Sequence, residues 1–511
     1  MSNPDYWQER AEKRIHRAHR NSDKTIKEVT AAYQQAVDDI NSDIEKIFYR
    51  YAKKNDLSSA EAKDILNQKI SENEWNQIKL QISSIKDPVI KKQLRAKLEA
   101  SAYGARIDRL EALKQDIYIK TKQVADVELQ KSTELYRKTV EDNYLHSVFD
   151  FQQGTGYAYE FASMSPEHIE EILKNNWSGK HYSKSVWDNT DVLAEKLQQT
   201  LTIGLMSGKS YKRMAAELTE LTSYGQYAAE RLIRTETAYL IEESDKAAAI
   251  DRGTKVRIFR ATLDLKTSKI CREHDGDRVS IEKSVPGKNV PPLHPHCRSW
   301  MEEEIEGYEH RIRAARDPVT GERVMVPAEM KYADWYDKYV KNNPEAMAKE
   351  KALKNYQLDK KQYQEYENIL GVKKVPKTLK EFQEMKYSNS EEWLKKQREF
   401  STVSKIKNKP TYSDIYRQKM IDSYYHFRDL GYEFTDHSLN RFHGQKASKG
   451  KRLFTEEDLL EILSNDSNYM EEATNRIVKF YDDIAVIQNA ETKEVVSIVT
   501  RSTVKEGWKK L

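Results

Sequence analysis

This chain has few cysteines, little net charge and no long apolar run, and each shortage narrows the classes of protein to which it can belong. Its 511 residues include only two cysteines, and no secretory signal is visible in the opening MSNPDYWQER. We therefore expect synthesis in a reducing compartment, where a disulfide is disfavoured. A net charge of +4 supplies no overall basic field for binding nucleic acid. No apolar run approaches the roughly 20 residues of a membrane span, so we expect a soluble protein that joins any larger assembly through protein contacts.

Charged residues make up 33% of the chain and apolar residues 38%, a composition that favours long solvated helices over one large core. Residues 5–58 predict one long helix or two shorter ones, because apolar residues recur there in steps of three and four. Such a helix can pack inside its own chain or form a coiled coil with a partner subunit. The apolar positions are Ile26, Val29, Tyr33, Ala36, Ile40, Ile44, Ile47 and Tyr51.

Both cysteines lie in one stretch rich in glycine and proline, CREHDGDRVSIEKSVPGKNVPPLHPHC. Each has a histidine three residues away, so Cys271-x-x-His274 and His294-x-x-Cys297 offer two short pairs of zinc ligands. Four protein ligands would complete a tetrahedral site, so a zinc ion (Zn2+) bound here would be structural. The alternatives are a disulfide, or two unconnected thiols beside ordinary histidines. A nucleophilic Cys–His pair is disfavoured, because no third group is visible nearby to orient the histidine.

Motifs around this stretch resemble those of one protein family. The run from Gly204 to Glu236 ends in Arg-Thr-Glu, and a short β segment with an aspartate-threonine turn runs from Phe259 to Cys271. The stretch closes with a Pro-Pro-x-His-Pro-x-Cys-Arg signature that ends at Arg298. Over about residues 5–310, this pattern resembles the phage head morphogenesis family, the minor head proteins similar to protein F of phage Mu.

The resemblance implies a place in the virion, in the capsid interior or at the portal vertex, and in the host cytoplasm during assembly. The implied partners are the portal and other head proteins, with phage DNA as a further candidate. His274 and Ser299 stand where many relatives have cysteine. The first departure exchanges one zinc ligand for another, so it leaves the predicted site intact.

Residues 410–511 differ in character from the rest. Helices come first and the strands RIVKFY, IAVIQ and VVSIVTRS follow, an order typical of an α+β module with an antiparallel sheet. His437 and Arg441 lie one turn apart on an expected helix and therefore share a face. Over about residues 415–508, this order resembles small phage-encoded toxin nucleases of the barnase/EndoU/colicin/RelE-like superfamily.

Metal-independent RNA cleavage requires an acid, a base and cations beside the phosphate. His437 would transfer protons, Arg441 would hold the phosphate in a bidentate fork, and Thr500 or Arg501 would complete the set from the last strand. His443 ranks second, because it falls off the face that His437 and Arg441 share. The alternative is an ordinary helix histidine beside a solvated arginine.

A basic run follows the expected catalytic helix. Arg441 to Arg452 contains five basic residues and no acidic one, so this segment would guide an RNA backbone. The module has no visible Asp/Glu/His cluster with metal-ligand spacing, so magnesium-dependent hydrolysis is the less natural mechanism. Whether the module is an active enzyme stays open.

The sequence predicts four parts: a long-helix region (1–200), a Mu F-like head domain with the Cys/His loop (201–310), a linker with a small helical motif (311–409) and a nuclease-like module (410–511). The expected fold class is mainly α, with a small β segment in the head domain and an α+β module at the end. The leading function is a portal-associated minor head protein that carries an RNase toxin module. The alternatives are a structural head protein whose last module is an inactive docking domain, and a free intracellular nuclease toxin with a helical targeting region.

Overall fold

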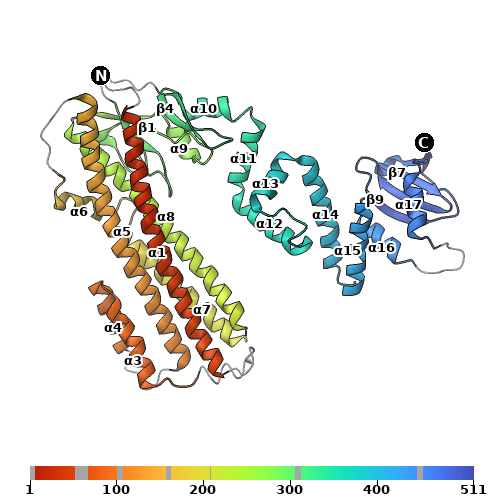
Figure 1. Cartoon of the computed structure of the whole chain (residues 1–511), viewed down its shortest axis with the longest axis horizontal. Coiled ribbons are helices and arrows are strands. Elements are labelled where there is room, and N and C mark those ends of the chain that lie inside the picture. The colour runs from red at the N-terminus through yellow and green to blue at the C-terminus, as the bar shows by residue number, and fades with distance from the viewer. Residues whose placement is uncertain are drawn as a thin grey trace. The chain divides into compact units, whose positions relative to one another are not determined.

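The computed structural model describes residues 6–51, 67–100, 108–156, 163–207, 209–304, 312–445 and 453–511. The chain divides into two compact units, Met1–Tyr339 and Val340–Leu511 (Figure 1). Each unit has a hydrophobic core of its own. The predicted fold class is confirmed, since helices dominate and the sheets are small and antiparallel.

Four long helices form the body of the first unit and lie side by side (Figure 1). They are α1 (Tyr6–Tyr51), α5 (Arg109–Thr155), α7 (Tyr182–Met206) and α8 (Tyr211–Asp251). From the predicted apolar stripe of α1, Val29, Tyr33, Ile40 and Ile44 are buried against α5 and α8, while the side chains of Ile47 and Tyr51 lie outside the described part of the chain. This stripe is therefore used for packing inside its own chain. Shorter helices complete the helical part: α3 (Glu72–Gln81), the 3-10 turn Ile82–Ser84, α4 (Pro88–Ala100) and α6 (Pro166–Lys174).

The interior of this bundle contains polar groups as well as apolar ones. Glu128 of α5 is fully buried and accepts a hydrogen bond of 3.0 Å from the Tyr33 hydroxyl of α1. Burial raises the pKa of Glu128 to about 7. Lys120, also buried, donates to Asp116 over 2.6 Å. Each of these groups gains a partner that offsets part of the cost of leaving water.

A small antiparallel sheet follows α8. Its strands, in the order β2-β1-β3, are β1 (Val256–Arg260), β2 (Arg278–Ser280) and β3 (Trp300–Glu303). The predicted β segment Phe259–Cys271 is strand only as far as Arg260; a turn around Asp264 and the start of α9 (Lys269–His274) follow. The hairpin β4 (Ile312–Arg316) and β5 (Arg323–Pro327) and the helix α10 (Tyr332–Tyr339) close the unit. The 3-10 turn Ile281–Lys283 lies directly after β2.

The second unit opens with five helices, and four of them, α12 to α15, share one core with the final module. These helices are α11 (Pro344–Lys354), α12 (Tyr356–Leu370), α13 (Leu379–Ser388), α14 (Ser390–Asn408) and α15 (Asp414–Asp429). Tyr366, Phe382 and Val403 pack in the same cluster as Tyr424 and Phe427 of α15. The range 311–409, expected to be a linker with a small helical motif, thus has two parts: residues 312–339 belong to the first unit, and α11–α14 are helices of the second.

The rest of this unit has the predicted α+β order. The helices α16 (Asp436–His443) and α17 (Glu456–Ser464) precede a five-stranded antiparallel sheet in the order β10-β6-β7-β8-β9. Its strands are β6 (Tyr469–Glu471), β7 (Arg476–Tyr481), β8 (Ile484–Asn489), β9 (Val495–Thr500) and β10 (Lys509–Lys510), with a 3-10 turn at Glu472–Thr474. Asp482 and Asp483 both have positive φ, as a two-residue type I′ hairpin between β7 and β8 requires. The three strands expected from the sequence are β7, β8 and β9.

Across the described parts of the chain, we find no helix that is both long enough and apolar enough to cross a membrane.

Candidate functional site

Three of the four predicted zinc ligands meet at one point. Cys271 comes from the first turn of α9, where the hydroxyl of Ser268 caps the helix, and His294 and Cys297 come from the loop that leads into β3. Their ligand atoms all lie within 4.8 Å of one another. Cys271 Sγ is 3.2 Å from His294 Nε2 and 3.6 Å from Cys297 Sγ. Both cysteines are buried and free, so the alternative of a disulfide is not what the structure contains.

Hydrogen bonds prepare these three groups to hold a metal. The Nδ1–H of His294 donates to the Pro295 carbonyl over 2.7 Å, which leaves Nε2 to face the sulfur atoms. The Cys271 thiol donates to the Cys297 sulfur, and this bond lowers the pKa of Cys297 and raises that of Cys271. The contact with Cys297 raises the pKa of His294. A thiolate, a thiol that can ionise and an imidazole are donors that suit Zn2+.

His274, the fourth predicted ligand, lies outside this group. Its Nδ1 is 2.8 Å from the Asp277 carboxylate, and its ring packs beside Phe259 with 5.7 Å between ring centres. The Cys-x-x-His spacing alone could not reveal this, because the orientation of His274 depends on the turn that follows α9. Three protein ligands leave one tetrahedral position for water or another donor, so the expectation of a closed four-ligand site does not follow from this geometry.

Residues of the flanking motifs hold the Cys/His loop in place. The backbone N–H of His296 donates to the Thr235 hydroxyl of α8 over 3.2 Å. The guanidinium of Arg298 donates two hydrogen bonds, of 2.5 and 2.9 Å, to the Asp264 carboxylate. The Asp264 carboxylate also accepts from the backbone N–H of Lys266 over 2.9 Å, which closes the aspartate-threonine turn. The sequence motifs marked these residues, but their role in fixing the loop becomes visible only in the fold.

The predicted catalytic residues of the second unit occupy two places. His437 and Arg441 are exposed on α16, one turn apart as expected. The helix begins beside the start of β9, where the Thr435 N–H donates to the Val495 carbonyl over 3.1 Å. Thr500 and Arg501 lie at the other end of this strand. Among the described residues, no hydrogen bond or ion pair joins either member of the first pair to either member of the second.

Arg501 and His443 have contacts of their own. The guanidinium of Arg501 lies 5.6 Å from the centre of the Trp508 ring. His443 Nε2 is 2.8 Å from the Ser423 hydroxyl, and burial together with Lys419 lowers the pKa of His443 to about 4. A histidine with this pKa is neutral at pH 7, so His443 is less suited than an exposed histidine to act as an acid there. Most of the basic run lies outside the described residues, since these omit 446–452.

Comparison with known proteins relates the first unit to phage head proteins. Residues 195–302 match the family described as Phage Mu protein F like protein. The chain is 22% identical over 229 residues to Minor head protein GP7 of Bacillus phage SPP1, which covers 42% of this chain and 73% of that protein. It is 24% identical over 221 residues to NAD(+)--arginine ADP-ribosyltransferase EFV of Enterococcus faecalis, which covers 40% of this chain. The chain spans 44% of the length of that relative. No solved structure matches the chain.

Proposed function

We propose that this chain is a minor head protein of a phage, because the segment that matches the phage Mu protein F-like family contains Cys271, His294 and Cys297. It is located in the virion and contacts the portal and other head proteins. The single observation that carries this proposal is that the matched residues 195–302 include Thr235, Asp264, both cysteines and Arg298. The contacts of these residues connect the Cys/His loop to the sheet and to α8. The family motif therefore coincides with the place where these three parts meet.

In this proposal, a zinc ion bound by Cys271, His294 and Cys297 strengthens that joint. The ion would link α9 to the loop before β3, and its binding free energy would add to the stability of the fold. The chain supplies the donors and the hydrogen bond that orients His294. A water molecule or another donor would complete the coordination.

Assembly can be tested by dividing the chain between its two compact units, after Tyr339. Phage particles are assembled with the full chain, with residues 1–339 or with residues 340–511, and the protein content of purified particles is measured by mass spectrometry. We expect the full chain and residues 1–339 to be incorporated at similar levels, because the matched segment lies in the first unit. Incorporation of residues 340–511 but not of a folded 1–339 fragment would contradict the proposal.

We further propose that the second unit is a ribonuclease carried as cargo. The observation that favours this role is an exposed histidine and arginine on one face of α16, which packs against the last long strand of the sheet. His437 would transfer the proton and Arg441 would bind the phosphate, with Thr500 or Arg501 contributing from β9 if RNA bridges the two ends of that strand. The competing role is an inactive docking domain.

Cleavage of single-stranded RNA by residues 340–511 in EDTA separates these two roles. We expect products that end in a 2′,3′-cyclic phosphate, and a rate reduced by about two to four orders of magnitude in His437→Ala. Arg441→Lys should also impair cleavage, since an ammonium group cannot form the bidentate fork. His426→Ala is the matched control, because His426 is another exposed histidine and pairs with Glu456 over 2.5 Å. Equal rates in wild type and His437→Ala, or no cleavage by the folded unit, would leave the docking role.

A further inference from the structure

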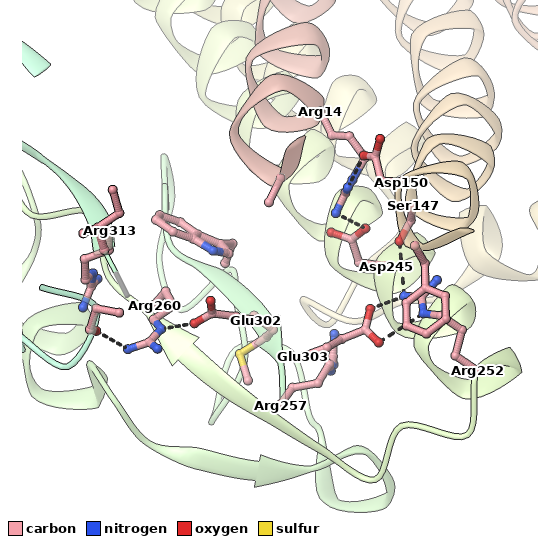
Figure 2. Close-up of a pocket in the computed structure, with 16 residues that line it drawn as sticks. Arg14, Ser147, Asp150, Asp245, Arg252, Arg257, Arg260, Glu302, Glu303 and Arg313 are labelled. Carbon is pink, nitrogen blue, oxygen red and sulfur yellow. Dashed lines mark hydrogen bonds and ion pairs between the residues drawn. The ribbon is translucent and has the colours of Figure 1, made fainter. Parts of the chain in front are cut away.

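A cavity of about 70 Å³ lies where the helical bundle meets the small sheet (Figure 2). Helices α1, α5 and α8 form one side of it, and β1, β3 and β4 form the other. Its volume exceeds the roughly 30 Å³ that one water molecule occupies in the liquid. The cavity therefore has room for a small polyatomic group. Among the described residues, those that line it include the arginines Arg14, Arg252, Arg257, Arg260 and Arg313.

Carboxylates hold most of these arginines in fixed orientations. Arg14 donates to Asp150 over 2.6 Å, and Arg252 is paired with Glu303. Arg260 is likewise paired with Glu302 (Figure 2). These pairs neutralise much of the charge, but they also fix the guanidinium groups around the cavity before any ligand enters. Such preorganisation lowers the cost of binding.

Arg257 is the least exposed of these five arginines. Its side chain is 1% exposed, and its Nη2 donates to Glu242 over 2.5 Å. Within the described part of the chain, its Nε and Nη1 have no hydrogen-bond partner. The Nε of Arg14 also lacks one. A buried donor without an acceptor costs about 1–3 kcal/mol, and more when it is charged. The groups that lack a partner here are all N–H donors on cationic side chains, so an acceptor with negative charge would complement them best.

We propose that this cavity binds a small oxyanion, with Arg257 as its main ligand and Arg14 as the second. Glu242 does not line the cavity, so it can remain bonded to Arg257 Nη2 while Nε and Nη1 bind the anion. The chemical class is a phosphate group, whose several oxygens can accept from both guanidinium groups at once. The phosphate is either free or the end of a larger molecule that reaches in from the partly exposed rim at Glu302 and Glu303. This site is separate from the Cys/His group and from α16.

Calorimetry and thermal unfolding of the full chain test the proposal with two probes, inorganic phosphate and adenosine 5′-monophosphate. Sodium chloride at equal ionic strength controls for screening. We expect inorganic phosphate to bind and to raise the melting temperature, while chloride does not. Binding of adenosine 5′-monophosphate alone would assign the site to the phosphate group of a larger molecule.

Arg257→Lys keeps a positive charge beside Glu242 but removes the Nε and Nη1 donors, so phosphate affinity should fall at least about tenfold, the equivalent of 1.4 kcal/mol. Arg14→Lys removes the second donor and gives an independent reading if Arg257→Lys does not fold. Arg137→Lys is the matched control, since Arg137 is an exposed arginine of α5 paired with Glu170, and it should leave the affinity unchanged. Failure of the wild-type chain to bind either probe would show that the cavity holds water only and would overturn the proposal. Equal affinity in wild type, Arg257→Lys and Arg14→Lys would overturn it as well.

Discussion

Replacing Glu128 by glutamine should remove a large part of the pH dependence of the first unit's stability. Burial in the bundle raises the pKa of Glu128 to about 7, and the hydrogen bond from Tyr33 offsets only part of this effect. An unfolded glutamate has a pKa of about 4.3. The folded state therefore keeps a proton over a pH range in which the unfolded state releases it. Stability from this group is complete below about pH 4 and is lost as the pH rises to about 7, a change of roughly 4 kcal/mol at 1.36 kcal/mol per pKa unit.

Urea denaturation of residues 1–339 at about pH 5 and about pH 8 measures this change. In wild type, the free energy of unfolding should be lower at about pH 8 than at about pH 5. In Glu128→Gln this decrease should be smaller by about 2–3 kcal/mol. Glu134→Gln is the control, because Glu134 is an exposed glutamate on the same helix. Burial also raises the pKa of Glu236 and Glu242 to about 7, so the variant should keep part of the wild-type slope. An identical pH dependence in wild type and Glu128→Gln would refute the reasoning.

Two further predictions concern the Cys/His framework. Elemental analysis of the purified full chain should find close to one zinc per chain. Cys297→Ser should lose the metal and have a lower melting temperature, whereas His274→Ala should keep the metal, since His274 lies outside the group. Equal loss of zinc from both variants would contradict this prediction. Arg298→Lys should lower the free energy of unfolding by about 1 kcal/mol, because a lysine cannot make both bonds to Asp264 and the site is partly exposed. Urea titration measures this change, with the exposed Arg137→Lys as the control. An unchanged unfolding midpoint in Arg298→Lys would show that the Arg298–Asp264 pair does not stabilise the fold.

Local patterns in the sequence predicted the elements whose signal is local. The apolar repeat around Val29 and Tyr33 located α1, and the β-branched runs located β7 to β9. Cysteine and histidine spacing found Cys271, His294 and Cys297 together. The same spacing also included His274, because a three-residue interval records proximity along the chain and not the direction of a ring.

Features that depend on distant contacts had no such signal. Glu128 looks like any helix glutamate until α1 covers it with Tyr33. Arg257 lies on a short strand, and its pairing with Glu242 joins residues of different elements. The aromatic residues of α12 looked like part of a linker, because the core that they share with α13 and α14 is built with α15.

The unbroken length of α8 has a mechanical consequence. This helix has 41 residues and extends over about 60 Å at 1.5 Å per residue, with its last turns beside the sheet and Thr235 bonded to the Cys/His loop. A rod of this length acts as a lever. A tilt of about 5° at the sheet end would displace the far end sideways by about 5 Å. Because α1, α5 and α7 pack against α8, such a tilt would require the whole bundle to repack, so these contacts fix the direction in which the helix meets the sheet.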